Sequence, residues 1–544
     1  MTESSMSKPG TTKDKPKRPW RDNLEAFGVA ILAAVLLKPM IIEAYQIPTS
    51  SMQPTLMGSA EAGVYDRILV DKLRYEIFEP KRWDIVVFRY PIRRNQNYVK
   101  RLAGMPGDRL RIAGGNLWHV GEDGEVDHVL RKPDRIQRGL WKEIYPARTA
   151  VGSPGKVLNT FFSGAIGKWS EDGTTLKAEP SSSGRTLLTY LDTPNRGLSN
   201  QVYDGYPGFV ARAIRQNGGA GAGGSRGVQD ARMAFTLTAE RPPTVLRMKL
   251  DLRPAAHSRR TYELVVKDGQ ARLRVKVAEE ERAVSEPVPC ALEAGGSTRL
   301  AFAHIDDRLL GWIDGEQVLE VEVGTARVLH PLETGQVTLS VETEGGGGLA
   351  FGDVKVERDL HYVPTGLEDD LENLVKEGEQ ALLNHVIEIP EGHYMMLGDN
   401  TLASADSRQW LVVSIGATPD GWMVDPTHHA EDQNVRLLKG NRRPWGLEEK
   451  PDNDENPVVV RSRTKGEPDM VAFTDDDGQV YALKTFLAPN YSPGGMHFQE
   501  RNGVTRTWQP PEEHVYFVPR EHILGRPVLG FWPLFSPFRL GFIR

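Results

Sequence analysis

Short runs in which apolar and polar residues alternate are the most regular feature of the chain. Nine follow one another in its central part: Met233–Thr238, Thr244–Leu252, Tyr262–Val266, Ala271–Val277, Arg299–His304, Leu309–Ile313, Val318–Val323, Val337–Val341 and Leu349–Val356. A period of two puts apolar side chains on one face of a strand. The turn sequences Lys267-Asp268-Gly269-Gln270 and Ile313-Asp314-Gly315-Glu316 are typical of hairpins. The pattern predicts an all-β sandwich over residues 150–365.

Strand-like runs also flank this region. Before it, β-branched residues concentrate at Arg67–Asp71, Asp84–Tyr90, Asn97–Gly104 and Arg109–Ile112, and proline or glycine turns separate these runs. After it, helical spacing of apolar residues predicts one helix near Glu368–Leu383, which leads to a strand at Val386–Ile389. Residues 415–511 are polar, rich in proline and acidic in patches, with short strands expected at Val458–Val460 and Val480–Phe486. We expect an irregular insertion there.

One apolar run near the N-terminus is long enough to cross a bilayer. A helix from Leu24 to Ile42 would extend roughly 28 Å, close to the ~30 Å hydrocarbon core. Basic residues precede the run, which predicts a cytoplasmic N-terminus and an extracytoplasmic bulk of the chain. A cleaved signal peptide is the alternative, but the residues after the run contain no A-x-A-like cleavage site. We therefore expect an uncleaved, single-pass anchor.

These patterns divide the 544 residues into several units. The expected units are a disordered cytoplasmic tail (1–19), a transmembrane anchor (20–43), a catalytic domain in three pieces (44–149, 366–414 and 512–544), the sandwich insertion (150–365) and the irregular insertion (415–511). A net charge of −6 with both signs interspersed gives no indication of nucleic-acid binding. The single cysteine, Cys290, excludes a disulfide scaffold.

Candidate chemistry begins just after the apolar run, where Ser50 and Ser51 stand between Pro48 and Pro54. A serine becomes a nucleophile only when a base takes its proton. The 13 histidines form no recognisable constellation, and the adjacent pair His428-His429 is better explained as an exposed loop than as a metal site. A lysine can serve as base if burial lowers its pKa. Lys100, among apolar strand residues, is the plausible candidate, although most such lysines are only strand-edge charges.

Four blocks in order resemble the type I (leader) signal peptidases, a family of membrane-bound Ser/Lys endopeptidases. Ile47–Leu56 is similar to the family's I-P-S-G-S-M-x-P-T-L, and Trp83–Phe88 to G-D-I-V-V-F. Tyr98–Asp108 is similar to Y-[IV]-K-R-x-x-G-x-P-G-D, and Gly398–Arg408 to G-D-N-R-D-N-S-x-D-S-R. The blocks cover about a quarter of the chain. The resemblance implies a mainly β fold: an antiparallel β catalytic domain behind a transmembrane helix, here interrupted by the sandwich.

The resemblance also implies roles for individual residues. Ser51 would be the nucleophile, in preference to Ser50, and Lys100 the general base. Thr49 stands where the family has an oxyanion-hole serine, and Ser404 where a serine orients the lysine amine. Asp406 and Arg408 would form a supporting salt bridge. The walls of shallow pockets for small substrate side chains would be formed by Tyr45, Ile47, Val87 and Val99.

The function implied is removal of signal peptides from exported preproteins at the outer face of the cytoplasmic membrane. The expected partners are preproteins and the lipid bilayer, with no nucleic acid, metal or cofactor. Two alternatives remain: another Ser/Lys peptidase with a different substrate, and a degenerate scaffold that presents the sandwich as a binding module. If Lys100 is the base, activity should rise with an apparent pKa well below the ~10.4 of free lysine.

Three features depart from the family pattern. Thr401-Leu402-Ala403 replaces R-D-N, which puts the support given by those polar residues in doubt, and Trp83 replaces a glycine. The third is the long insertion between Asp108 and Gly398. Its strand texture and its Trp312–Gly315 hairpin resemble laminin-G or concanavalin-like jelly rolls. The sandwich could bind an unknown ligand or act as a spacer.

Overall fold

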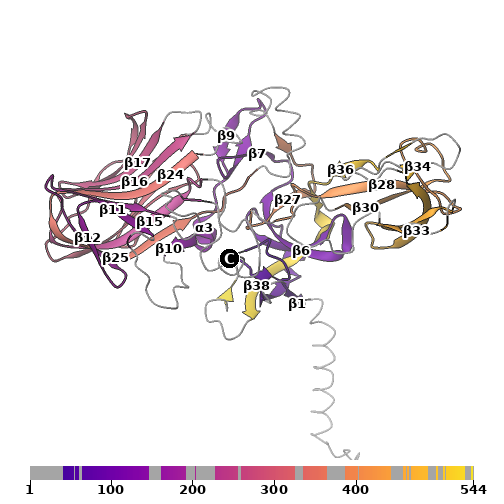
Figure 1. Cartoon of the computed structure of the whole chain (residues 1–544), viewed down its shortest axis with the longest axis horizontal. Helices are drawn as coiled ribbons and strands as arrows, with labels where there is room; N and C mark the ends of the chain where they lie inside the picture. Colours follow the sequence, from indigo (N-terminus) through magenta and orange to yellow (C-terminus); the bar gives the residue numbers. More distant parts are fainter. Residues whose placement is uncertain are drawn as a thin grey trace, which may run out of the picture.

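The computed structural model is mainly β, as expected from the sequence (Figure 1). It describes residues 41–53, 55–59, 64–145, 158, 161–191, 202–203, 227–254, 259–324, 335–363, 386–401, 404–442, 458–460, 462, 464, 467–487, 498–499, 507–508, 510–532 and 541–542. Within these residues, no helix combines the length and apolarity needed to cross a membrane. The expected helix at 368–383 and residues 1–40, with most of the expected anchor, lie outside this described part.

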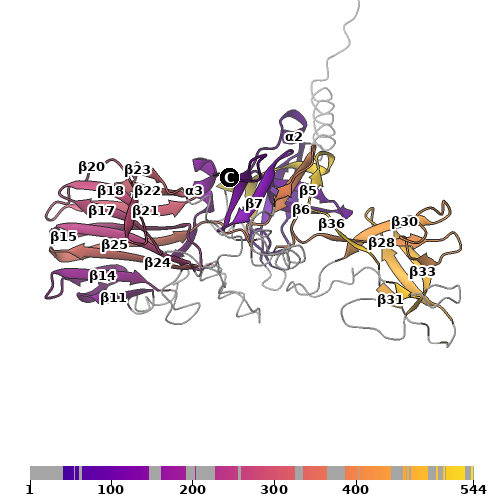
Figure 2. The same ribbon diagram turned by 90° about the horizontal axis from the view of Figure 1, so that it is seen from above.

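The central part of the chain forms two sheets of eight strands each, seen as two layers in Figure 1, where β16, β17 and β24 lie above β15, β25 and β10. In Figure 2 the two sheets overlap, and their strands follow one another from β20 and β23 at the top to β11 at the bottom. In one sheet the order is β12 (Lys168–Asp172), β13 (Thr175–Glu179), β25 (Gly347–Arg358), β15 (Ala231–Arg241), β21 (Ser297–Ile305), β22 (Arg308–Ile313) and β23 (Glu316–Glu322), and β10 (Lys142–Tyr145) pairs with β25. In the other it is β11 (Phe162–Ile166), β14 (Arg185–Tyr190), β24 (Gly335–Glu344), β16 (Val245–Pro254), β17 (Arg260–Lys267), β18 (Gln270–Val277) and β19 (Glu280–Val284), and β20 (Val288–Pro289) pairs with β18.

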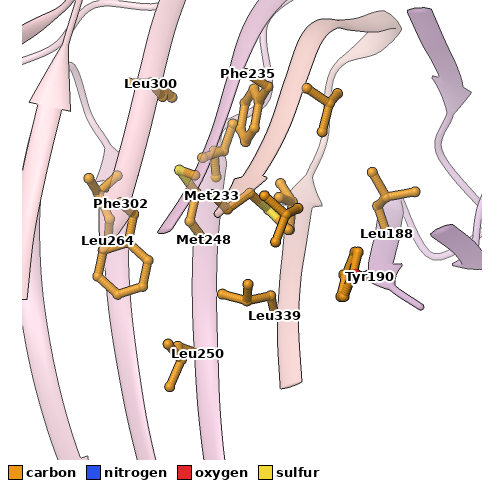
Figure 3. Close-up of a cluster of buried hydrophobic side chains, with 14 of the residues drawn as sticks. Leu188, Tyr190, Met233, Phe235, Met248, Leu250, Leu264, Leu300, Phe302 and Leu339 are labelled. Carbon is orange, nitrogen blue, oxygen red and sulfur yellow. The ribbon is translucent and has the colours of Figure 1, made fainter. Parts of the chain in front are cut away.

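One hydrophobic core joins the two sheets, as in a β-sandwich (Figure 3). Met233 and Phe235 of β15 face Met248 and Leu250 of β16 across it. All nine strands predicted from alternation are present, because a period-two pattern buries one face of each strand. Both predicted hairpin turns are also present, with Asp268 and Asp314 at φ values of 52° and 51°.

A second β unit precedes and follows the sandwich in sequence. Its main sheet has the order β1 (Ile42–Gln46), β4 (Arg67–Asp71), β38 (Ile523–Trp532), β5 (Ile85–Tyr90), β6 (Arg93–Gly104), β27 (His393–Leu397) and β37 (Val518–Pro519), with β39 (Gly541–Phe542) on β38. A smaller sheet has the order β26 (Ile387–Glu388), β7 (Arg109–Ala113), β8 (Asn116–Val120) and β9 (Val126–Val129). The remaining elements are β2 (Gly58–Ser59), β3 (Val64–Tyr65), α2 (Arg74–Ile77), α3 (Asp134–Leu140) and the 3-10 turn η1 (Arg520–His522).

One detail of this unit differs from expectation, and a second shows where its C-terminal strand pairs. The anchor was expected to reach residue 43, but β1 begins at Ile42, which pairs with Asp71. The backbone of residues 42 and 43 is bonded to β4, and this tertiary pairing outweighs their apolar helical pattern. The C-terminal strand β38 lies inside the sheet between β4 and β5 despite Pro527. A register shift between Pro527 and Leu529 accommodates the proline, which cannot donate to the ladder.

The second insertion is more regular than its composition predicts. β28 (Leu411–Ala417) crosses the expected boundary at 415 and pairs with β30 (Arg436–Arg442), β29 (Met423–Val424) and β36 (Glu512–His514). A further sheet holds β31 (Val458–Val460), β32 (Asp469–Thr474), β33 (Val480–Leu487), β34 (Phe498–Gln499) and β35 (Thr507–Trp508). The second insertion has a hydrophobic core of its own, which includes Ile415 of β28, Phe473 of β32 and Trp508 of β35. A strand needs only a few buried apolar residues to pack in a sheet once it pairs with strands distant in sequence. The average composition of the segment does not reveal these few residues.

Candidate active site

Hydrogen bonds to Asp66, the residue that follows β3, hold the loop that carries Ser51. Ile47 N–H donates to the Asp66 carbonyl at 2.9 Å, and Met57 N–H donates to Asp66 Oδ2 at 2.6 Å. Ser51 is 8% exposed, and its Oγ lies 3.3 Å from Thr49 Oγ1. The two hydroxyls assigned from the sequence to nucleophile and oxyanion donor are therefore neighbours on one fixed loop.

Lys100 projects from β6, where it stands opposite Val86 of β5. Its side chain is only 3% exposed, and Nζ lies 5.8 Å from the centre of the Tyr98 ring. Strand alternation explains why Lys100 and its neighbours Val99 and Arg101 differ in direction. In general, burial disfavours the charged form of a lysine amine, whereas a nearby carboxylate favours it.

Gly398 brings the Ser51 loop and the last sequence block together. A Cβ atom added at Gly398 would lie 2.0 Å from Ser404 Oγ and 2.5 Å from the Ser51 carbonyl oxygen. Only a residue without a side chain permits this approach. Ser51 and Ser404, more than 350 residues apart in sequence, therefore meet around Gly398.

Asp406 lies at the centre of a buried polar network. It accepts hydrogen bonds from Ser404 Oγ at 2.9 Å, from Gly398 N–H at 3.0 Å and from both Nε and Nη2 of Arg408 at 2.7 Å. Burial by itself would raise the pKa of Asp406, but the Arg408 charge, these hydrogen bonds and the Lys100 charge hold the pKa below its usual value. The ion pair expected between Asp406 and Arg408 is present, and Lys100 is close enough to act on it electrostatically.

A second buried pair, which the sequence did not single out, supports the 398–408 loop. Arg101 donates from Nε and Nη2 to Asp399 at 2.8 and 2.7 Å, and from Nη1 to the Trp83 carbonyl at 2.7 Å. Asn400 donates from its backbone N–H to the Ser51 carbonyl at 3.1 Å and from Nδ2 to the Ser50 carbonyl at 2.9 Å. The support that Thr401-Leu402-Ala403 put in doubt therefore comes from Asp399 and Asn400.

The sandwich reaches the same loop through the strands by which the chain enters and leaves it. We call Lys142–Tyr145 and Val356–Val363 the stem; Lys142 and Arg358 are paired across it. Lys142 Nζ donates to the Asp399 carbonyl at 2.6 Å, and Arg408 Nη1 donates to the Val363 carbonyl. Sequence analysis missed Lys142, since nothing in its local pattern distinguishes it from other charged strand residues.

Trp83 adopts a left-handed backbone conformation, with φ of 73°. This region is disfavoured for residues with a Cβ, which accounts for the glycine that the resembling family has there. The indole is buried, donates from Nε1 to the Arg131 carbonyl at 3.1 Å and stacks 6.5 Å from the Tyr362 ring. Here tryptophan packing against the stem offsets the backbone cost.

The four side chains expected to line substrate pockets lie in one apolar cluster. Ile47 and Val87 are buried there with Met52, and Tyr45 and Val99 pack against them from partly exposed positions. Val87 and Val99 are directly opposite in β5 and β6. The cluster lies beside the residue that follows Ser51, and its partly exposed members present a small apolar surface.

One β unit of the chain thus carries a buried serine, a buried lysine and a hydrogen-bonded Ser–Asp–Arg network. The sequence profile described as "Signal peptidase, peptidase S26" matches residues 20–143 and 347–421. These two segments of the chain are therefore similar to the signal peptidases. The gap in the match, residues 144–346, begins within β10 and ends immediately before β25, so it covers most of the sandwich.

Pairwise comparisons also find similarity to individual signal peptidases. The chain is 29% identical over 170 residues to signal peptidase I of Aquifex aeolicus (strain VF5), which covers 27% of the chain and 64% of the relative. It is 29% identical over 136 residues to signal peptidase I of Leptolyngbya laminosa, with 24% and 64% covered. For that of Buchnera aphidicola, the values are 39% over 111 residues, with 18% and 33% covered. The chain thus spans less than two thirds of the length of these relatives.

Solved structures resemble the chain only distantly. The carbohydrate-binding module CBM66 from Bacillus subtilis aligns with 36% of this chain and 96% of its own length, at 11% identity and a TM-score of 0.23. The galectin LEC-6 of Caenorhabditis elegans aligns with 24% and 84%, at 13% identity and a TM-score of 0.18. Likenesses at this level do not indicate what the sandwich binds.

Proposed function

We propose that this protein is a membrane-bound endopeptidase that cleaves signal peptides from exported preproteins with a Ser51/Lys100 dyad. The observation that carries the proposal is the approach at Gly398, where the Ser51 carbonyl and the Ser404 hydroxyl would both contact an added Cβ. Through Ser404 the serine loop meets Asp406, whose carboxylate interacts with Lys100. Three blocks that are distant in sequence thus converge on one serine.

In the proposed mechanism, Ser51 Oγ attacks the scissile carbonyl while Lys100 Nζ takes its proton. A lysine accepts a proton only in its neutral form, which burial favours. The developing oxyanion would be stabilised by the Ser51 N–H and the Thr49 hydroxyl, and one such donor is typically worth ~3 kcal/mol. Lys100 then protonates the leaving amine and activates a water that hydrolyses the acyl-enzyme. The Ser404–Asp406–Arg408 network would orient the lysine.

The apolar cluster around Tyr45, Ile47, Val87 and Val99 supports a preference for small side chains at the first and third substrate positions before the cut. Two of these side chains are already buried against Met52, which leaves little volume for a bulky substrate residue. An extended substrate could add its backbone to a strand edge, so that the pockets alone would set the sequence preference.

Attachment to a bilayer is part of the proposal. Exposed apolar side chains concentrate where the chain leaves residue 40: Ile41 and Ile42 at the start of β1, and Leu73, Ile77 and Phe78 around α2, the last two 69% and 51% exposed. The Lys72 N–H donates to the Ile41 carbonyl, which holds the two groups side by side. Such a patch next to an anchor that ends before β1 would rest on lipid, with the catalytic part outside the cytoplasm.

The proposal is tested by assaying the full chain in phospholipid vesicles with a preprotein that has alanine at both positions. Cleavage should be lost in Ser51→Ala and Lys100→Ala, whereas the matched variant Ser50→Ala should retain it, because Ser50 contributes its carbonyl to the site. Cleavage of other membrane proteins but not of this substrate would favour a different Ser/Lys peptidase. Cleavage that persists in Ser51→Ala would rule out Ser51 as the nucleophile, and an inactive wild type would favour the degenerate scaffold.

A further inference from the structure

We propose that the sandwich positions the 398–408 loop through its stem, and that Lys142 is a positioning residue for catalysis. This inference rests on the proposed function above. It gives the sandwich insertion a structural role, for which no bound ligand is needed. The stem makes two hydrogen bonds to the loop, one at each end: Lys142 Nζ to the Asp399 carbonyl at 2.6 Å, and Arg408 Nη1 to the Val363 carbonyl.

The stem is itself held rigidly. Lys132, just before α3, pairs with Asp306 of the sandwich at 2.6 Å and with Asp359 of the stem at 2.9 Å. All three side chains are buried. Farther along, Tyr362 N–H donates to the Gly115 carbonyl at 2.9 Å. Buried, fully paired polar groups tolerate little displacement, because breaking one leaves an uncompensated charge.

The loop in turn holds the serine. Asn400, next to the residue whose carbonyl Lys142 contacts, donates to the carbonyls of both Ser50 and Ser51. A shift of Asp399 would therefore move the Ser51 backbone. Misplacement of a reacting group by about 1 Å can cost ~100-fold in rate. A buried lysine that donates to a main-chain carbonyl of such a loop acts on catalysis through that loop.

The test compares Lys142→Met, which cannot donate, with Lys142→Gln, whose amide can, and with Lys177→Met on the sandwich surface as the matched control. All are full chains in vesicles. Lys142→Met should lower kcat by about 10-fold or more with KM within about twofold, and Lys142→Gln should recover part of this loss. In parallel, amide hydrogen exchange should rise at residues 398–408 in Lys142→Met alone.

Unchanged kcat and unchanged exchange in Lys142→Met would overturn the inference. So would equal losses in Lys142→Gln and Lys142→Met, since a shared loss would reflect volume rather than donation. If the wild type does not cleave the preprotein, the proposed function fails. Exchange then still decides whether Lys142 positions the loop.

An independent observation concerns the β8–β9 hairpin, where we infer a surface site for a divalent transition-metal ion such as Zn²⁺. His119 and His128 are directly paired across the two strands, and Asp127 precedes His128. One ligand atom from each residue lies within 4.8 Å of the others. Asp127 Oδ2 is 2.8 Å from His128 Nδ1 and 3.4 Å from His119 Nδ1.

The spacing suits one tetrahedral ion. With bonds of about 2.0–2.1 Å, ligand atoms are about 3.3 Å apart and two bound imidazole rings have centroids about 5 Å apart. The His119 and His128 centroids are 5.0 Å apart. Among the described residues, His119 Nδ1 has no hydrogen-bond partner although it has almost no solvent contact. Glu122, Asp123 and Glu125 in the adjoining turn add negative charge, which favours a cation.

The site belongs to a different sheet from β5 and β6, so its metal would have no part in the dyad chemistry. It would instead join the last strand of that sheet, β9, to its neighbour β8. The three residues supply mixed N/O ligands and leave a fourth position for water, a set that suits zinc better than calcium or magnesium.

The test is a titration of the untagged full chain with Zn²⁺ by calorimetry, and with Co²⁺ by visible absorption. One equivalent should bind with a tetrahedral Co²⁺ spectrum, and His128→Ala and Asp127→Asn should each weaken binding by about 10-fold or more. His393→Ala, at a partly exposed histidine on β27, is the matched control. An absence of saturable binding, or equal binding by wild type and both variants, would overturn the inference.

Discussion

The Ser404 hydroxyl donates to Asp406 Oδ2 at 2.9 Å, and the Asp406 carboxylate is in turn held by Arg408. The hydroxyl proton therefore points at the aspartate, which leaves the Ser404 oxygen as an acceptor for the amine proposed as base. Ser404→Ala should lower kcat by about 100-fold with little change in KM, within the range expected when a proton-transfer group loses its orientation. Steady-state kinetics on the preprotein check this. A loss confined to KM would assign Ser404 to substrate binding instead.

Gly398 offers a steric test of the same site. In Gly398→Ala the new methyl group would meet Ser404 Oγ and the Ser51 carbonyl, so the two loops must separate. We expect activity to fall below detection while the far-UV circular dichroism is retained. Gly392→Ala is the control, because a Cβ there has no neighbour within 4 Å, although its φ is positive. Wild-type activity in Gly398→Ala would contradict the geometry of the site.

The backbone conformation of Trp83 leads us to expect that Trp83→Gly is more stable than Trp83→Ala. Trp83→Ala loses the buried indole, which costs about 3–5 kcal/mol, and retains the unfavourable left-handed conformation. Trp83→Gly loses the same packing but removes about 1 kcal/mol of that backbone cost. The glycine variant should therefore be more stable than the alanine variant, the reverse of the usual order. Urea unfolding followed by circular dichroism decides the order.

Lys142 predicts a pH dependence of stability. Burial, reinforced by the Arg358 charge, lowers the pKa of Lys142 to about 7, below the ~10.4 of free lysine. Between about pH 10 and pH 7 the unfolded chain binds a proton that the folded chain does not, so Lys142 lowers stability as pH falls through this window. Below about pH 7 the proton is bound in both states and the contribution is constant.

Lys142→Met removes this contribution. The Tm of wild type minus that of the variant should thus increase as pH rises from about 7 to about 10, and should be level between about pH 5 and pH 7. Thermal scans of both proteins in matched buffers measure the difference. A difference that does not vary with pH would mean that Lys142 stays protonated in the folded state.

Many strand positions could be predicted because they depend on local sequence. Each predicted strand of the sandwich has alternating side chains, and Asp-Gly turns at 268–269 and 314–315 separate hairpin partners. The second insertion was less readable. β28 and β36 are about 100 residues apart in sequence and are nevertheless paired. The local sequence of neither strand indicates a pairing partner so distant along the chain.

The candidate site divides in the same way. Ser51, Lys100, Ser404, Asp406 and Arg408 stand in the sequence blocks that resemble the signal peptidases, and the resemblance implied their roles. Arg101 and Asp399 lie in the same blocks, but their pairing across 298 positions appears only in three dimensions. Lys142 stands outside every block, and its importance comes entirely from burial beside the Asp399 carbonyl.

By itself, the sequence determined the resemblance to the signal peptidases, the choice of a candidate nucleophile and base, and the β character of the insertion. These depend on residue type and short-range period, which the chain expresses locally. Only the tertiary structure decided that β38 lies within the catalytic sheet, that the second insertion has its own core, and that the sandwich contacts the 398–408 loop. Those relationships arise from non-local strand pairing and from buried polar groups that must find partners, and neither leaves a local pattern.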